Sequence, residues 1–175
     1  TTPAIMYTGS GAISLLLAPG EKTNIFINQR EICRRQSKLH REKKSDEANV
    51  YYGGYLAGLS AEINKLNFQT EIDSDYPLFI QELKDKNAEE VKAYILEKQQ
   101  SKLREIENLK ATKACKAVLH NAVNASAASL LMFVPQIVQR VHIVNYKLEG
   151  EASKEYVKNN PVQLPDNFYD LLKYF

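Results

Sequence analysis

Histidines, cysteines and one glycine-containing turn are the residues of this chain whose types could support chemistry. His40, His120 and His142 are scattered, and none lies at ligand spacing with another histidine, a cysteine or a glutamate. A zinc site needs three or four such ligands held together. Cys115 and His120 are five residues apart, which places them off a shared helical face. The pattern therefore predicts no metal site.

The two cysteines leave two alternatives open. Cys33 is followed by Arg34 and Arg35, but the sequence places no general base beside it, so we expect a packed cysteine, not a nucleophile. Two free thiols are one interpretation of the pair. A single bridge between Cys33 and Cys115 is the other, and it would require an exported protein.

Residues 6–14 read M-Y-T-G-S-G-A-I-S, and a strand, this turn and a helix would resemble a dinucleotide-binding loop. However, Ser14 occupies the third glycine position, a helix from residue 12 would end at Pro19, and no βαβ pattern follows. The chain also lacks a phosphate-loop motif, a nucleophile elbow and an H-E-x-x-H motif. We therefore predict no cofactor and no enzymatic activity.

A basic block covers residues 30–44, with seven cations against two acids. Such a block binds nucleic-acid phosphates, anionic lipid headgroups or an acidic protein partner. Interleaved aromatic residues, which single-strand readers use for stacking, are absent, and the net charge of the chain is only +2. These features disfavour nucleic acid and leave an acidic partner open, for which the acidic segment 62–90 is one candidate. The basic patch consists of Arg30, Arg34, Arg35, Lys38, Arg41, Lys43 and Lys44.

From Ala117 to Gln139 the chain contains no Asp, Glu, Lys or Arg. The stretch is long enough to span a membrane, but polar residues interrupt it, and Pro135 should kink or end a helix there. We expect a helix that is buried or lies in an interface, with a membrane span as the alternative. Leu130, Leu131 and Phe133 are its candidate partner contacts.

The preceding segment, Glu82 to Lys116, consists of helix formers dense in charge, without Pro or Gly. We expect one long helix that passes from solvent into a buried environment, with Asn87 and Glu90 as a capping signal near its start. Its apolar stripe at residues 91, 95, 103, 106 and 109 is narrow. A narrow stripe surrounded by charge is typical of a protruding or coiled-coil-like helix.

Another helix is predicted to begin at Ser45 and to carry apolar residues on one face. Tyr51 and Tyr55 lie on that face. Gly54 and Gly58 lie on a neighbouring face, where the absence of side chains lets another backbone approach closely. These four residues form a candidate contact surface.

The C-terminal residues predict a last helix, capped by Asp166, with apolar residues at i, i+3, i+4 and i+7. Such a helix closes the protein's own core or inserts into a partner groove, and terminal helices more often dock on their own domain. The residues of this docking set are Phe168, Leu171, Leu172 and Phe175.

Shorter elements are predicted elsewhere. Residues 3–8 suit a short strand or an extended arm, and residues 23–29 suit a short strand or an apolar docking segment. Residues 12–18 suit a short helix. Pro77 suits the first turn of a helix that is capped by Ser74 or Asp75. The chain therefore predicts a mainly α fold, an elongated helical bundle with one long central helix and short strands near the N-terminus. We expect one domain over 1–175, with an irregular arm (1–29) and a C-terminal docking helix (166–175).

No constellation of residues for acid–base, nucleophilic or metal chemistry emerges from this pattern. We therefore expect a non-enzymatic structural or accessory subunit of a larger protein assembly, acting through helix-mediated contacts with other subunits. Two alternatives remain: an exported or host-directed helical binding module, and a membrane-associated subunit with 117–139 in lipid. The sequence does not predict a compartment.

Overall fold

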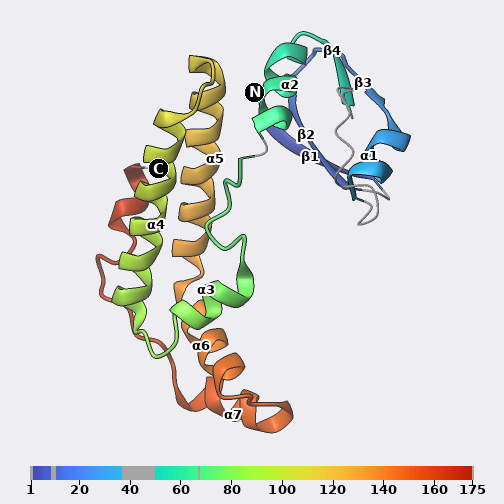
Figure 1. Cartoon of the computed structure of the whole chain (residues 1–175). Helices are drawn as coiled ribbons and strands as arrows, with labels where there is room; N and C mark the ends of the chain where they lie inside the picture. Colours follow the sequence, from blue (N-terminus) through green and yellow to red (C-terminus); the bar gives the residue numbers. More distant parts are fainter. Residues whose placement is uncertain (1, 9–10, 37–49, 67, 175) are drawn as a thin grey trace. The chain divides into compact units, whose positions relative to one another are not determined.

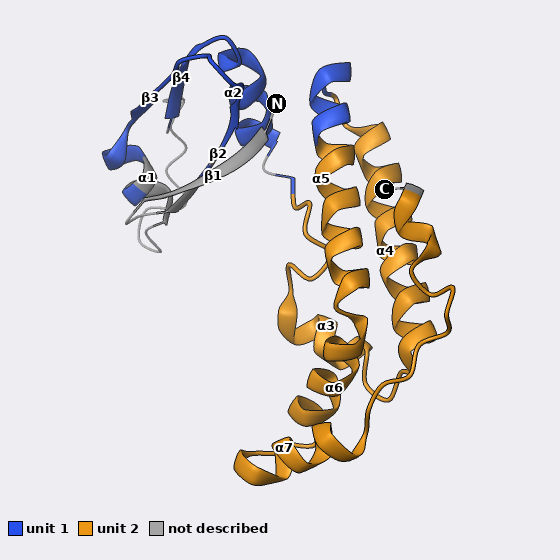
Figure 2. Ribbon diagram, turned by 180° about the vertical axis from the view of Figure 1, so that it is seen from behind, with its two compact units in different colours: residues 1–68, 111–118 blue, residues 69–110, 119–175 orange. Residues whose placement is uncertain are grey.

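The computed structural model describes residues 2–8, 11–36, 50–66 and 68–174. The chain divides into two compact units (Figure 2): unit 1 contains residues 1–68 and 111–118, and unit 2 contains residues 69–110 and 119–175. Helices dominate and the strands are short, so the predicted mainly α fold with N-terminal strands is confirmed. The expectation of one domain with an arm and a docking helix stays a prediction.

Unit 1 contains two antiparallel strand pairs (Figure 1). Strand β1 (Thr2–Thr8) pairs with β2 (Gly11–Leu17), with Thr8 opposite Gly11. Strand β3 (Thr23–Ile27) pairs with β4 (Val50–Gly54). The strand predicted over 3–8 is thus confirmed, and the strand predicted over 23–29 is confirmed over 23–27.

Two short helices complete unit 1. Helix α1 (Gln29–Gln36) begins where the Asn28 side chain accepts a hydrogen bond from the backbone N–H of Glu31, at 3.1 Å. Helix α2 (Ala57–Leu66) packs against β2 and β4. The buried hydroxyl of Ser60 in α2 accepts a hydrogen bond from the backbone N–H of Leu16, at 3.0 Å. Because both groups are buried, this bond satisfies a strand amide that water cannot reach.

Two sequence predictions in unit 1 are wrong. The helix predicted over 12–18 is wrong, because residues 12–17 lie in strand β2 and pair along their length with β1. A strand after the G-x-G turn also contradicts the dinucleotide-loop alternative, which requires a helix there. The helix predicted from Ser45 is wrong over 50–54, which form β4 opposite β3. Its predicted start at Ser45 lies outside the described residues.

Unit 2 is helical (Figure 1), and short connections join its helices from α3 to α7, while a longer segment leads from α7 to the C-terminal η1. Helix α5 begins in unit 1 and continues into unit 2. The elements are α3 (Tyr76–Glu82), α4 (Ala88–Asn108), α5 (Lys113–Met132), α6 (Val134–Asn145), α7 (Gly150–Asn159) and the 3₁₀ helix η1 (Asp170–Tyr174).

Local capping signals place several helix starts where the sequence predicts them. Asp75 caps α3, accepting a hydrogen bond from the Leu78 N–H at 3.2 Å, with a proline in the first turn. Asn87 and Glu90 form a complete capping box at the start of α4, with bonds of 3.0 and 2.8 Å. Pro135 lies in the first turn of α6, directly after α5 ends.

The single long helix expected across Glu82–Lys116 is wrong, because the chain breaks between α4 and α5. Leu109 takes an extended conformation, and α5 begins after Thr112. The Thr112 hydroxyl accepts a hydrogen bond from the Cys115 N–H at 3.2 Å, the bond of an N-cap. The α2 residue Glu62 accepts hydrogen bonds from the backbone N–H of Thr112 at 2.7 Å and from its hydroxyl at 2.6 Å.

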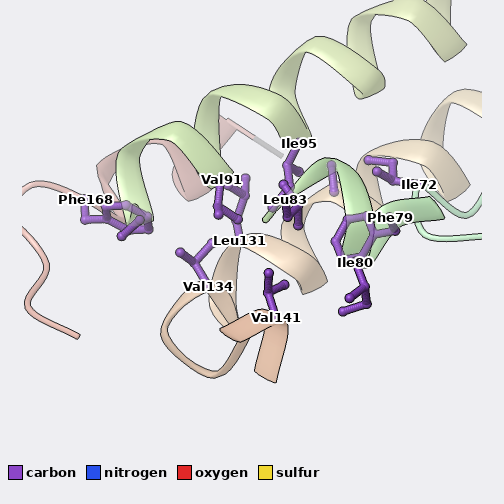
Figure 3. Packing of buried hydrophobic residues seen from close by; sticks show 12 residues of the cluster. Ile72, Phe79, Ile80, Leu83, Val91, Ile95, Leu131, Val134, Val141 and Phe168 are labelled. Carbon is purple, nitrogen blue, oxygen red and sulfur yellow. The ribbon is translucent and has the colours of Figure 1, made fainter. Parts of the chain in front are cut away.

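The core of unit 2 lies where α3, α4, α5 and α6 meet (Figure 3). Val91 and Ile95 of α4 are fully buried there, so the narrow apolar stripe of α4 packs into the protein's own core. The twelve buried residues of this cluster are Ile72, Phe79, Ile80, Leu83, Ala88, Val91, Ile95, Ala127, Leu131, Val134, Val141 and Phe168.

Candidate functional site

One face of α5 is buried at a spacing of four residues. Leu119, Val123, Ala127 and Leu131 are each at most 3% exposed. Since residues four apart lie above one another on a helix, these side chains form a single stripe. Leu131, a predicted partner contact, therefore belongs to the protein's own core, and Leu130 packs against the same cluster while half-buried.

The opposite face of α5 is exposed and carries no charge. At 100° per residue, Asn121, Ala125, Ala128 and Met132 lie within about 60° of one another, opposite the buried stripe. Asn121 and Ala125 are exposed, Ala128 is half-buried, and Met132 is 58% exposed. We call these four residues the outer face of α5. Its side chains are small except at the C-terminal end.

Helix α4 lies beside α5 in Figures 1 and 2, and its exposed face differs from the outer face of α5 in charge. The face of α4 that points away from the core is exposed and dense in charge, as a solvated helix face should be. Its exposed charged residues are Glu89, Glu90, Glu97, Arg104, Glu105 and Glu107. Of these two neighbouring helices, α4 therefore exposes a charged face and α5 exposes an uncharged one.

Polar contacts fix α4 and α5 against each other within unit 2. The Gln99 amide, which is 6% exposed, donates a hydrogen bond to the Asn124 carbonyl oxygen at 2.9 Å; we call these two residues the amide pair. Nearer the end of α4, His120 Nε2 lies 3.0 Å from a Glu107 carboxylate oxygen. Because buried amides need partners, the amide pair also specifies the register of the two helices.

The junction of α5 and α6 exposes two large apolar side chains. Phe133, which separates the two helices, is 54% exposed, next to the exposed Met132. The Tyr169 hydroxyl lies 3.5 Å from the Met132 backbone oxygen, so the C-terminal segment passes this junction. Phe133 is thus the one predicted contact of the 130–133 segment that stays largely in solvent.

The C-terminal docking set packs on unit 2 itself. Phe168 is 1% exposed in the core, and Leu171 and Leu172 are half-buried against it. The Lys92 ammonium lies 4.4 Å from the Phe168 ring centre and donates a hydrogen bond to its backbone oxygen at 3.0 Å. The own-core expectation agrees with this packing, although the helix is a 3₁₀ helix over 170–174 and does not start at 166. Phe175 lies outside the described residues.

The predicted helical surface of tyrosines and glycines is not formed in unit 1. Tyr51 lies in β4 opposite Phe26, and both are exposed, as is Tyr55 after the strand. Gly54 has a positive φ of 103°, and a Cβ there would come within 2.1 Å of the Lys22 backbone oxygen. Gly58 is the second residue of α2, and a Cβ there would meet open space. The glycines therefore share no helix face.

The basic patch is only partly described. Arg30 lies exposed in α1, which also contains Arg34 and Arg35. Lys38, Arg41, Lys43 and Lys44 lie outside the described residues. Its preference for an acidic partner stays a prediction.

The two cysteines are not bridged to each other. Cys33 is exposed, Cys115 is buried, and both are free thiols. Burial raises the pKa of the Cys115 thiol, and the negative charge of Glu62 raises it further. No cluster of three or more His, Cys, Asp or Glu residues that could hold a metal occurs in the described ranges.

Two hydrogen-bonded carboxylates have shifted pKa values. The Tyr94 hydroxyl donates to Glu82, and Lys98 lies 3.1 Å from the same carboxylate; both bonds lower the pKa of Glu82. The bonds from Thr112 lower the pKa of Glu62. Both carboxylates thus bind protein donors.

None of the described helices is by itself long and apolar enough to cross a membrane. Helices α5 and α6 pass such a test only together, and the chain bends by 74° between them. Searches against protein-family models, curated proteins and solved structures return no match to this chain.

Proposed function

We propose that this chain is a non-enzymatic structural or accessory subunit of a larger protein assembly, and that the outer face of α5 is its principal contact. The observation that supports the proposal is the uncharged, exposed surface from Asn121 to Met132 beside the charged surface of α4. A helix on the surface of a soluble protein ordinarily carries charge opposite its buried stripe. The outer face of α5 departs from that rule.

The chemistry of this face suits a packed helix–helix contact. Alanines let a second helix approach closely, and the lone amide of Asn121 can be paired across an interface. Met132 and Phe133 at its end are large, apolar and exposed, and residues of these types are enriched in interface cores. The face thus combines a close-packing stripe with apolar anchors.

A membrane-associated subunit is the second candidate, because α5 and α6 together are apolar enough to enter a bilayer. The two candidates differ in what covers the outer face. If a protein partner covers the outer face, only a complementary helix or a second chain can take its place. If lipid covers the face, detergent or vesicles alone can replace the lipid.

The test is the solution mass of the purified chain, by light scattering after size exclusion, over a range of concentrations with and without detergent. A matched pair of variants uses exposed alanines of two helices: Ala125→Glu on the outer face of α5 and Ala93→Glu on the charged side of α4. We expect self-association or binding to assembly partners to be lost in A125E and kept in A93E. A monodisperse monomer without detergent, unaffected by A125E, would contradict both candidates.

A further inference from the structure

The β3–β4 strand pair of unit 1 exposes two aromatic rings on its outer surface. Ile25 and Tyr52 pack inward, against the small core that contains Ile13. Side chains alternate along a strand, so Phe26 and Tyr51 point to the other side. These two residues lie directly opposite each other; we call them the aromatic pair. Phe26 is 68% exposed and Tyr51 is 52% exposed, so more than half of each residue's surface stays available to a ligand.

A third exposed ring follows at one end of the strand pair. Tyr55 comes directly after β4 and is 74% exposed. Thr23 pairs with Gly54, so Tyr55 lies at the end where β3 begins. The exposed aromatic residues of unit 1 therefore occur both within the strand pair and at its end.

Exposed cations lie at both ends of β3. Lys22 directly precedes the strand, and Arg30 is in the first turn of α1, which follows the strand (Figure 1). Glu21 is also exposed and partly offsets the charge of Lys22. Helix α1 contains three arginines against one glutamate, Glu31, which is buried. The α1 end of the strand is therefore the more positive of the two.

The two units differ in charge in the same sense. Unit 1 contains eleven Lys and Arg residues against six Asp and Glu, whereas unit 2 contains twelve against fifteen. The small net charge of the whole chain thus combines a basic unit with an acidic one. A basic unit attracts a polyanion, and its field guides that polyanion to the surface.

Stacking distinguishes the possible polyanions. The basic block 30–44 contains no aromatic residue, which disfavours nucleic acid from the sequence alone. The strands that precede and follow this block supply the missing rings, Phe26 from β3 and Tyr51 from β4. An acidic protein surface needs only the cations. A single-stranded nucleic acid uses both features, because its bases stack on rings and its phosphates pair with cations.

We propose that the outer surface of the β3–β4 pair binds single-stranded nucleic acid. Bases stack on Phe26 and Tyr51, and the phosphate backbone runs past Arg30. Binding of this kind tolerates any base sequence, since every base has a flat face. The proposal is independent of the outer face of α5, which belongs to unit 2, so the failure of either leaves the other standing.

The experiment is a fluorescence anisotropy titration of the whole chain into labelled oligothymidylate of about 12 nucleotides, within the site size of known single-strand modules. Oligouridylate of the same length decides between DNA and RNA as the preferred strand. Three comparators are a DNA duplex of that length, inorganic polyphosphate, and phosphatidylserine vesicles. We expect saturable binding of at least one single strand at low salt and weaker binding of the duplex and of polyphosphate.

Variants of the aromatic pair test the stacking. Phe26→Ala and Tyr51→Ala should each weaken single-strand binding about tenfold, as for the loss of one stacked base. Tyr51→Phe keeps the ring and should keep the affinity. Tyr76→Ala removes an exposed tyrosine of unit 2 and is the matched control, with no change expected. Ring-proton NMR of isotope-labelled phenylalanine, assigned by F26A, should show the Phe26 signals moving upfield under a stacked base.

A second pair of variants tests the cation. Arg30→Gln should weaken binding and lower the slope of log affinity against log salt by about 0.7, the value for one phosphate contact of a single strand. Lys158→Gln removes an exposed cation of α7 in unit 2, so both variants change the net charge equally. We expect affinity and slope to stay unchanged in K158Q.

Four outcomes would overturn the proposal. The first is no saturable binding of either single strand. The second is equal affinity for single strand, duplex and polyphosphate, because then the rings contribute nothing. The third is full affinity in a folded F26A or Y51A variant, or an equal loss in R30Q and K158Q. The fourth is a loss of vesicle binding in F26A and Y51A without any effect on oligonucleotides, which would assign the surface to anionic lipid.

Discussion

Replacing Phe168 by alanine should unfold unit 2 far more easily while leaving unit 1 unchanged. The ring is 1% exposed in the main core cluster and lies under the Lys92 ammonium. A buried Phe→Ala change costs about 3–5 kcal/mol through lost burial and the cavity that remains. The lost contact with Lys92 adds to this, since a cation over a ring contributes about 0.5–2 kcal/mol.

The measurement must resolve the two units. Hydrogen exchange with mass spectrometry, in increasing urea, follows peptides from α4 and from β3–β4 in one sample. With a urea dependence of about 1–3 kcal/mol per molar, the expected loss shifts the α4 transition by roughly 2 M. Phe26→Ala is the control, because that ring is 68% exposed and its removal should cost less than about 1 kcal/mol.

A loss below about 1 kcal/mol for F168A would refute the reasoning. It would mean that the C-terminal segment is not seated on the core in solution and is free for a partner groove. The same substitution therefore decides between the two roles that an amphipathic C-terminus suggests.

Three further predictions concern single contacts. The pKa of Glu62 is lower in the folded chain than in the unfolded chain, so its hydrogen bonds to Thr112 stabilise the start of α5 above the unfolded pKa and are lost as the pH falls through the folded pKa. Hydrogen exchange at the Thr112 amide should therefore become faster as the pH falls through the folded pKa, and Glu62→Gln should remove this pH dependence. Gly54→Ala should destabilise unit 1 by more than about 1 kcal/mol, whereas Gly58→Ala, in open space within α2, should stabilise it by about 0.5–1 kcal/mol in thermal unfolding. Replacing the asparagine of the amide pair by leucine should cost about 1–3 kcal/mol in urea unfolding, and replacing both amides should cost less than the sum.

Features encoded by neighbouring residues could be predicted from the sequence. The caps at Asp75 and Asn87 were found because donor and acceptor lie within three residues of each other. The break of the helix at Pro135 could be predicted for the same reason, since proline has no backbone N–H and its ring clashes with the preceding turn of a helix. The buried stripe of α4 follows from the helical repeat, whereas α5 carries no charge from Ala117 onward, so the repeat does not show which of its faces is buried.

Features that depend on distant partners could not be predicted. Tyr51 and Tyr55 fit a helical spacing, but Tyr51 pairs with Phe26 across a sheet, from 25 residues earlier in the chain. The break before α5 has a local signal, the N-cap residue Thr112. Its second partner, Glu62, comes from α2, 50 residues away. Among helix formers such as those of 82–116, one threonine is a weak signal until its partner is known.

The stretch from Ala117 to Gln139 contains no charged residue, but only part of it is buried in the protein's own core. Burial by the protein's own core explains the absence of charge at the stripe of 119, 123, 127 and 131, at Val134, and at the residues that pack against the core cluster, such as Leu130 and Ile137. A charged side chain at Asn121 or Ala125 would meet solvent and would cost unit 2 nothing in packing. The core therefore does not account for the missing charge on the outer face. A second surface that covers this face would account for it, since an unpaired charge in an interface core is destabilising.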